Sequence, residues 1–355
     1  MDHLIEFMKR LPEGMEAALI ISPENRRYLT GFASSAGMLL CTREESYFLI
    51  DFRYFEKAKR TVKGCRVLLL EDLKAQAEEI FARHQVNTVG IEAAAVTLEE
   101  FASLQKRFPK RSFDASSAVS DCLFSMRSIK SPEELTTIKA AQAITDRAFA
   151  EALNFIKLGV TEKQVAAYLE YQMKLLGADG LAFDTIAVSG ENSSLPHGTP
   201  TERELRNGDF LTMDFGASVD GYCSDMTRTV AIGQVDELQM TVYNTVLKAQ
   251  EKAFDMIRPG IPGKQVDAAA RNFIDNRGFA GCFGHGLGHS VGLFIHESPC
   301  FNTREETLLA PGMVITVEPG IYLEGKFGVR IEDMVVITEH GYENLTKSEK
   351  QLITL

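Results

Sequence analysis

The sequence predicts an α/β protein built from two domains, and three observations lead to this prediction. The chain has 355 residues, which is long for one ordinary hydrophobic core and suits two. Hydrophobic residues make up 45% of it and charged residues 25%, as in a typical globular enzyme. Short apolar runs alternate with amphipathic runs of helical length, which is the pattern of a mixed α/β fold.

Residues 1–125 are expected to form a small α/β domain. Apolar runs bounded by turn signals predict strands at residues 17–21, 37–42, 47–50, 66–70 and 88–91, the second and third forming a hairpin. Amphipathic spacing predicts helices at residues 52–61, 73–84 and 97–108. Asp51 and Thr97 have short polar side chains that can cap the first and third of these helices.

A boundary is expected near residues 126–132, so that a second domain covers residues 126–355. Ser131 can cap a helix at this point, and Pro132 suits its first position. Glu133 and Glu134 then fall in the first turn, where the helix dipole favours negative charge. These signals predict a long helix at residues 133–157.

The second domain is predicted to contain an internal repeat. Residues 157–165 read KLGVTEKQV and residues 258–266 read RPGIPGKQV, an offset of 101 residues (258 − 157). Each copy lies between two predicted helices, at 133–157 and 162–176 in the first half and at 239–257 and 264–277 in the second. Each half then continues into an acidic hairpin. Duplication explains this better than chance similarity, and it would bring both hairpins into one central cleft.

The first acidic hairpin joins residues 211–219 and 222–232 through Asp220-Gly221, a favoured two-residue type I′ turn. Such a turn pairs residue 219 with 222 and residue 216 with 225. Asp214 and Asp225 would then be diagonal neighbours on one face, roughly 7–8 Å apart at their Cα atoms. Their carboxylates could bracket one cation and reach a second.

The second acidic hairpin joins residues 313–323 and 327–337 through the loop at residues 324–326. It places Glu318 directly opposite Glu332, and facing carboxylates repel each other unless a cation supplies the counter-charge. Pro319-Gly320 is expected to introduce a β-bulge. One such acid alone would be interpreted as a solvated edge charge, but two same-face pairs on matching hairpins favour a metal site.

Four of the seven histidines lie near these hairpins: His197, His285, His289 and His296. Residues 284–289 (GHGLGH) form a Gly-rich turn, which lets the backbone approach a ligand closely. His289 adds one imidazole nitrogen to four carboxylates, a donor set that suits divalent cations such as Mn²⁺ or Co²⁺. Two such cations can activate water for attack on a carbonyl group, so the pattern predicts a metallohydrolase.

Together these motifs resemble the pita-bread metallopeptidases (family M24), which include methionine aminopeptidase, aminopeptidase P and Xaa-Pro dipeptidase (prolidase). The matching segments are SGEN (189–192) with Pro196-His197, MDFG (213–216), GYCSDMTRT (221–229), HGLGH (285–289) with His296-Glu297, VEPGIY (317–322) and VRIED (329–333). Residues 25–32 (NRRYLTGF) resemble the creatinase/prolidase N-terminal domain, so the similarity spans essentially the whole chain. Methionine aminopeptidases generally lack that domain, which favours the proline-directed branch.

The resemblance implies a site with two divalent cations, Mn²⁺ or Co²⁺, with Zn²⁺ as an alternative. Asp214 would chelate one cation, and Asp225 and Glu332 would bridge both. His289 and Glu318 would hold the second, and Glu318 would also transfer protons as general base and acid.

The remaining matched residues are expected around the substrate. The resemblance implies that His197 and His296 face the substrate and steady the tetrahedral intermediate, while His285 lines the pocket. Arg330 and Tyr322 would lie behind the ligands or beside the substrate. The implied reaction is hydrolysis of the bond between an N-terminal residue and a following proline, in small peptides with proline at the second position.

One departure from the family pattern bears on the substrate. Some prolidases carry an arginine shortly after the second histidine, where it can meet the carboxylate of a dipeptide. Here residues 296–300 read HESPC, so Cys300 replaces that arginine, although Arg304 or an arginine of the first domain could substitute. Xaa-Pro aminopeptidase and Xaa-Pro dipeptidase activities therefore both stay open.

Two other functions compete with this hypothesis. The first is creatinase-like amidine hydrolysis without metal, and the second is a non-catalytic pita-bread binding protein. Creatinases lack the five-ligand set, and binding proteins of this fold usually have eroded ligands. The complete set in this chain therefore favours the peptidase.

Charge and composition limit the partners. The net charge of −11 argues against nucleic-acid binding, which usually needs a basic face. No apolar run approaches the roughly 18 residues of a membrane span, and no signal peptide is visible. The six cysteines lack paired spacing, so reduced thiols and a cytoplasmic location are expected. The family resemblance predicts a homodimer.

Overall fold

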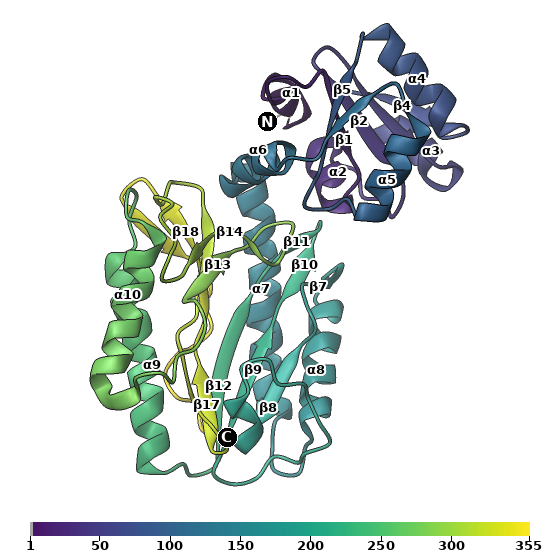
Figure 1. Cartoon of the computed structure of the whole chain (residues 1–355). Helices are drawn as coiled ribbons and strands as arrows, with labels where there is room; N and C mark the ends of the chain where they lie inside the picture. Colours follow the sequence, from purple (N-terminus) through teal and green to yellow (C-terminus); the bar gives the residue numbers. More distant parts are fainter. Residues whose placement is uncertain (1–2) are drawn as a thin grey trace. The chain divides into compact units, whose positions relative to one another are not determined.

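The computed structural model describes residues 3–355 and separates two units, Met1–Arg127 and Ser128–Leu355 (Figure 1). Each unit combines helices with mixed β-structure, in agreement with the α/β fold predicted from the sequence. No helix among the described residues is both long enough and apolar enough to cross a membrane.

The first unit is built on a six-stranded sheet in the order β4-β3-β2-β1-β5-β6. Its strands are β1 (Ala17–Ile20), β2 (Met38–Thr42), β3 (Ser46–Ile50), β4 (Arg66–Leu69), β5 (Thr88–Ile91) and β6 (Ser112–Asp114). Its helices are α1 (His3–Lys9), α2 (Pro23–Thr30), α3 (Phe52–Thr61), α4 (Leu73–Arg83), α5 (Leu98–Arg107) and α6 (Ala118–Ser128). The hairpin β2–β3 was predicted, whereas α1, β6 and α6 were not.

The helix starts follow the capping signals in the sequence. The Asp51 carboxylate accepts a hydrogen bond from the N–H of Arg53 at the start of α3. Thr97 forms a reciprocal capping box with Glu100 at the start of α5. Ser131 caps the long helix of the second unit in the same way, as predicted. These contacts lie within three residues in sequence, which is why the sequence alone identifies them.

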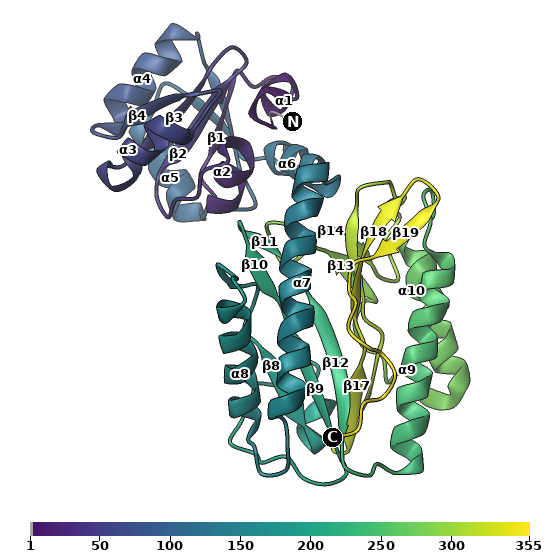
Figure 2. The same ribbon diagram turned by 180° about the vertical axis from the view of Figure 1, so that it is seen from behind.

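The second unit consists of two similar halves. The first half contains α7 (Pro132–Phe155), α8 (Glu162–Leu175), β7 (Gly180–Leu181), β8 (Ile186–Ser189) and β9–β12 (Asp209–Phe215, Ala217–Val219, Tyr222–Cys223, Met226–Ile232). The second contains α9 (Glu237–Met256), α10 (Gly263–Ile274) and β13–β19 (Gly288–Ser290, Glu297–Phe301, Val314–Val317, Gly320–Leu323, Phe327–Arg330, Asp333–Thr338, Gly341–Asn344). Helices α7 and α8 pack on strands of the first half, and α9 and α10 pack on strands of the second half together with Phe210 and Ala231 of the first. Figures 1 and 2 show that α7 lies on one side of β9 and β12, so the opposite side remains for a site.

The predicted repeat is visible in the backbone of the two halves. Gly159 and Gly260, at matching positions, have φ angles of 81° and 82°. The N–H of Gly159 donates to the carbonyl of Leu205, and the N–H of Gly260 donates to that of Leu309. Because left-handed φ angles strongly favour glycine, the turn that follows each first helix is determined locally in both halves.

The first acidic hairpin keeps the predicted register but is interrupted in the middle. Val219 pairs with Tyr222, as predicted, and Phe215 pairs with Met226. The expected pair of residues 216 and 225 is absent from the described ladder, and the N–H of Ala217 donates to the hydroxyls of Thr145 and Ser224. A Cβ atom on Gly216 would lie 1.9 Å from the carbonyl oxygen of Ser224. The interruption falls directly beside Asp225.

The second acidic hairpin also keeps its register, and the predicted β-bulge at Pro319-Gly320 is wrong. Leu323 pairs with Phe327, and Val317 pairs with Asp333, so no residue is inserted between the two ladders. Instead, the hairpin divides into two separate sheets around residues 318–319. Proline lacks the N–H that a continuous ladder would use.

Candidate metal centre

The two hairpins and strand β13, which carries His289, bring three of the five predicted ligands into direct proximity. Asp225, His289 and Glu332 each offer one ligand atom, and these atoms all lie within 4.8 Å of one another. The Nε2 atom of His289 lies 3.5 Å from a carboxylate oxygen of Asp225 and 3.5 Å from one of Glu318. Asp214 lines the same cavity, so all five predicted ligands face one space.

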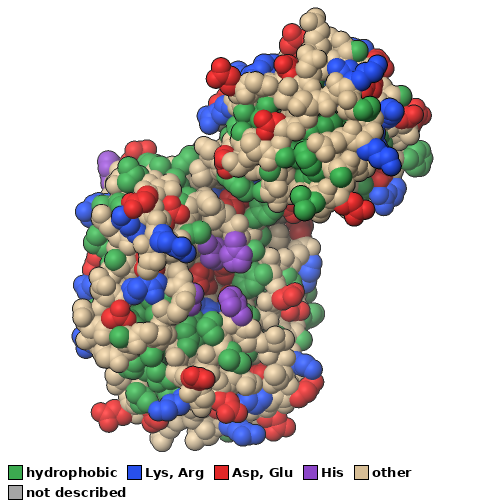
Figure 3. Space-filling view, viewed as in Figure 1, with side chains coloured by type: hydrophobic (Ala, Val, Ile, Leu, Met, Phe, Trp, Pro, Cys, Tyr) green, Lys and Arg blue, Asp and Glu red, His purple; other side chains and the backbone are tan. Residues whose placement is uncertain are grey.

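The cavity has a volume of about 550 Å³ and lies entirely within the second unit. Figure 3 shows histidine side chains around a hollow in which acidic side chains are visible. His197 and His296 line the cavity and are exposed, whereas Asp225 and Glu332 are buried. The arrangement therefore has an accessible rim of imidazoles above a buried floor of carboxylates.

Two of these carboxylates each have one buried oxygen without a hydrogen-bond partner among residues 3–355. These oxygens are the Oδ1 atoms of Asp214 and Asp225. Burial, followed by the nearby Glu332, Asp214 and Glu318 carboxylates, raises the pKa of Asp225 well above its ordinary value. Burial likewise raises the pKa of Glu318 to about 8. An unpaired buried carboxylate is costly, and a divalent cation would remove this cost.

His289 is oriented as a metal ligand would be. Its Nδ1 atom lies 3.2 Å from the carbonyl oxygen of Ser290, to which it can donate. The Nε2 atom then carries the free lone pair and faces the carboxylates of Asp225 and Glu318. Burial lowers the pKa of His289 to about 4, which keeps the imidazole neutral at neutral pH. A neutral imidazole fixed through its other nitrogen is the usual form of a histidine ligand.

Two threonine hydroxyls orient the glutamates. Thr227 donates to a carboxylate oxygen of Glu332 at 2.7 Å, and Thr316 donates to one of Glu318 at 3.1 Å. Thr227 also accepts from Nε of Arg330 at 3.0 Å. Both threonines are fully buried, so their hydroxyl groups are fixed by the surrounding strands. Neither threonine was predicted as a site residue, although Thr227 lies inside a matched motif.

Arg330, Tyr322 and His285 form a polar chain along the cavity wall. One guanidinium nitrogen of Arg330 donates to Asp214 at 2.6 Å, and the other contacts the Tyr322 hydroxyl at 3.0 Å. The Tyr322 hydroxyl lies 2.9 Å from Nε2 of His285, whose Nδ1 lies 2.8 Å from the carbonyl of Gly286. Burial lowers the pKa of His285 to about 4. The tyrosine can therefore donate to a neutral imidazole while accepting from the arginine.

His296 contacts a predicted ligand directly. Its ring packs against the ring of His289 at a centroid distance of 4.4 Å and an interplanar angle of 70°. His197 reaches the cavity from a separate segment, next to Pro196, whose carbonyl accepts a hydrogen bond from Arg330. The two predicted substrate-facing histidines thus border one cavity, together with the predicted ligands.

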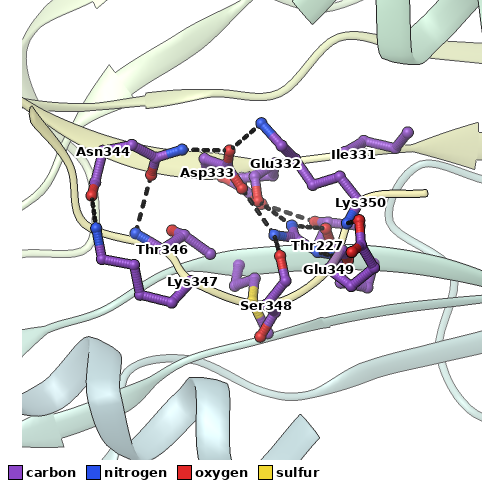
Figure 4. A network of polar contacts seen from close by, with 12 residues as sticks. Thr227, Ile331, Glu332, Asp333, Asn344, Thr346, Lys347, Ser348, Glu349 and Lys350 are labelled. Atoms are coloured by element: carbon purple, nitrogen blue, oxygen red, sulfur yellow. Dashed lines mark hydrogen bonds and ion pairs between the residues drawn. The ribbon is translucent and has the colours of Figure 1, made fainter. Parts of the chain in front are cut away.

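A second polar network lies directly behind Glu332 (Figure 4). Asp333 is fully buried and contacts Arg228 at 2.8 Å, Lys350 at 2.7 Å and Asn344 at 2.7 Å. Arg228 also donates to the backbone carbonyl of Glu332 at 2.6 Å. These contacts connect the C-terminal segment to both hairpins and fix the backbone next to the ligands. The network was not predicted, since the Arg228 contacts with residues 332 and 333 span more than 100 positions.

Cys300, which stands where some prolidases carry an arginine, lies at the cavity. Cys300 and Asn302 line the cavity, and Arg304 is exposed outside its lining. The N–H of Cys300 donates to the Glu305 carboxylate at 3.3 Å. The position where some prolidases have a cation is therefore next to a carboxylate in this chain.

Comparisons with known proteins agree with this geometry. The model of metallopeptidase family M24 matches residues 136–339, and that of the creatinase/prolidase N-terminal domain matches residues 1–129. The Xaa-Pro dipeptidase of Pyrococcus horikoshii is 38% identical over 99% of this chain and 97% of its own length.

Two solved structures are similar over the whole chain. The Xaa-Pro dipeptidase from Bacillus anthracis has a TM-score of 0.95 at 36% identity, covering 99% of this chain and 100% of its own. The X-Pro aminopeptidase from Thermotoga maritima MSB8 has a TM-score of 0.91 at 37% identity, covering 98% of this chain and 99% of its own. The two relatives differ in the activity that their names give.

Proposed function

Because this chain belongs to metallopeptidase family M24 and is a metal-dependent Xaa-Pro peptidase, we propose that its centre holds two divalent cations, Mn²⁺ or Co²⁺. Zn²⁺ is the alternative. The proposed ligands are Asp214, Asp225, His289, Glu318 and Glu332. We further propose that residues 126–355 form the catalytic domain and residues 1–125 the creatinase-like domain.

One observation carries the ligand assignment. Ligand atoms of Asp225, His289 and Glu332 converge within 4.8 Å, while buried carboxylate oxygens of Asp214 and Asp225 lack partners in the described structure. A purely structural cluster would satisfy these atoms with donors, as Arg228 and Lys350 do for Asp333. The donor set of carboxylates and one neutral imidazole fits divalent cations.

The catalytic roles follow from what each side chain can reach. Bound divalent cations supply Lewis acidity and activate water for attack on the scissile carbonyl. Glu318 transfers the proton, because its carboxylate lines the cavity and lies 3.5 Å from the proposed ligand His289. His197 and His296, at the exposed rim of the cavity, donate to the oxyanion that develops during the attack.

The remaining cavity residues bind the substrate. Apolar side chains available for a proline ring are Phe183, Ile186, Pro196 and Ile295. Arg330 and Tyr322 hold Asp214 and His285 in place from the cavity wall. The proposed substrate is therefore a small peptide with proline at its second position.

The charged residues that line the same cavity indicate which peptide lengths the enzyme can accept. Among its described lining residues, Arg330 is the only lysine or arginine, and it is already paired with Asp214 at 2.6 Å. Cys300 stands beside the Glu305 carboxylate instead of supplying a cation. We propose that a free carboxylate after proline is not required, so that peptides longer than Xaa-Pro are cleaved as well as dipeptides.

A peptide panel tests this function. Purified protein is assayed with Mn²⁺ or Co²⁺ on Ala-Pro, Ala-Pro-Ala and Ala-Pro-Ala-Ala, with Ala-Ala-Ala as the control that lacks proline. We expect release of alanine from all three proline peptides, little cleavage of the control, and loss of activity with EDTA. Cleavage of Ala-Pro alone would contradict the length proposal. Activity that resists chelation would contradict the metal centre.

Two finer proposals rest on the sequence: the homodimer on the family resemblance, and the location on the cysteine spacing. We propose a homodimer, which light scattering after size exclusion would measure, and a single-chain mass would contradict it. We also propose a cytoplasmic location, which fractionation of the source cells would test.

A further inference from the structure

A buried ion pair lies next to the proposed catalytic His296 and takes no part in the chemistry described above. Nζ of Lys130 lies 3.1 Å from Oε2 of Glu297, and the two side chains are only 1% and 3% exposed. Lys130 precedes helix α7, whereas Glu297 begins β14 and directly follows His296. The pair therefore joins two segments that are 167 residues apart.

The Glu297 carboxylate fits against the turn that carries His296. A Cβ atom on Gly292 would lie 2.6 Å from Oε2 of Glu297, so the carboxylate occupies the space that a side chain would need. The N–H of Phe294 points to Oε1 of Glu297 at 3.4 Å, and the N–H of Gly292 donates to the carbonyl of Phe294 at 3.0 Å. The carboxylate thus determines the path of residues 292–297.

The same turn is anchored to the first acidic hairpin. The carbonyl of Gly292 accepts a hydrogen bond from the N–H of Cys223 at 2.8 Å, two residues before Asp225. On the other side, Lys130 is fixed by its own backbone N–H, which donates to the carbonyl of Gly312 at 2.9 Å. The ion pair consequently joins two segments of the second unit that are each anchored by a backbone hydrogen bond.

The position of the His296 ring depends on this turn. The ring packs edge-to-face on His289, with centroids 4.4 Å apart, and a displacement of the turn would change this contact. A misplacement of about 1 Å can cost roughly 100-fold in rate when a catalytic group must meet a reacting atom. Stability alone does not explain the pair, because apolar side chains of similar volume often replace buried ion pairs without loss.

We propose that Lys130 and Glu297 are positioning residues that hold His296 over the metal centre. This inference rests on the proposed function, in which His296 donates to the developing oxyanion. Neither residue is among the described residues that line the cavity, and neither is a proposed metal ligand or proton donor. Their effect should therefore appear in kcat, with little change in KM or in bound metal.

The test compares stability with turnover in the full-length, metal-loaded enzyme. The variants are Lys130→Met, Glu297→Gln and the double variant K130M/E297Q, each assayed for Tm, kcat, KM and metal content. We expect each single variant to lower Tm, because it removes the opposite charge from beside a buried ionised side chain. The double variant should recover most of that Tm, while kcat remains at least about tenfold low with KM within about twofold.

Two further variants complete the test. Glu297→Asp keeps the charge but withdraws the carboxylate by one methylene, so it should lower kcat even if the double variant does not fold. Asp209→Asn weakens a partly buried ion pair with Arg203, which lies 2.6 Å away and outside the cavity lining. It should lower Tm without changing the kcat of the folded protein.

The outcomes separate this inference from the proposed function. If the wild type cleaves Xaa-Pro peptides and the double variant regains both Tm and kcat, the pair is only structural and the inference is overturned. Wild-type kcat in Glu297→Asp would overturn it as well. If the wild type itself cleaves no Xaa-Pro peptide, the proposed function fails instead.

Discussion

The substitution Asp225→Asn should stabilise the metal-free protein and destabilise the metal-loaded one. Asp225 is 4% exposed, and its pKa is raised by burial and by neighbouring carboxylates, so its charge is unfavourable without a cation. Asparagine has nearly the same shape but no charge. The variant thus removes like-charge repulsion and one proposed metal ligand at the same time.

The size of the stabilisation expected for the metal-free variant follows from the distance between the ligand atoms. Carboxylate oxygens of Asp225 and Glu332 lie within 4.8 Å of each other. At that distance two full charges repel by about 3 kcal/mol at an effective dielectric constant of roughly 20. Proton uptake relieves part of this repulsion, so we expect a gain of about 1–3 kcal/mol in the free energy of unfolding without metal, or roughly 2–8 °C in Tm.

The assay is thermal unfolding with EDTA and with excess Mn²⁺, together with metal content and Xaa-Pro cleavage. Wild-type Tm should rise with Mn²⁺, because the ion binds the folded state, whereas the variant should gain little. Its activity should fall at least about 100-fold. Asp220→Asn changes an exposed turn residue of the same hairpin and should alter neither quantity. A metal-free variant less stable than the wild type, or one with a full Mn²⁺ response, would refute the reasoning.

Three other predictions concern the proton donor, the pH dependence and the supporting network. Glu318→Gln should lower kcat by about 10²–10⁴-fold while metal analysis still finds at least one bound cation; full turnover would exclude its proton-transfer role. Burial raises the pKa of Glu318 from 4.5 to about 8, so the folded metal-free protein binds this proton more tightly than the unfolded chain. Its stability should consequently fall as pH rises from about 4.5 to 8, and a Tm measured with EDTA that stays flat or rises would contradict this. Lys350→Met removes a partner of buried Asp333 and should cost about 1–3 kcal/mol in urea unfolding. Lys248→Met, at an exposed position of α9, should cost less than about 0.5 kcal/mol, and equal losses in the two variants would argue against the network.

The predictions made from local sequence succeeded where the physics is local. Ser131, Thr97 and Asp51 cap helices through bonds that span two or three residues. The Asp220-Gly221 turn set the register of its hairpin, because a two-residue loop allows little choice. The meeting of the four acids at one cavity could also be predicted, since they lie on two hairpins whose registers could be counted from their turns.

The errors arose where distant segments meet. Nothing near Ala217 in sequence shows that its N–H would donate to the hydroxyl of Thr145, 72 positions away, where the ladder is interrupted. The bulge expected at Pro319 was replaced by a division of the hairpin into two sheets. Both interruptions depend on packing between strands, which a pattern along one strand does not describe.

The sequence by itself determined which groups could bind metal, because the ligand types and their hairpins are local properties of the chain. Only the tertiary structure decided what surrounds them. Thr227 meets Glu332 across 105 positions, and Lys130 meets Glu297 across 167. The free energy of such contacts depends on burial and on exact distance, and both exist only after the two halves of the second unit have packed together.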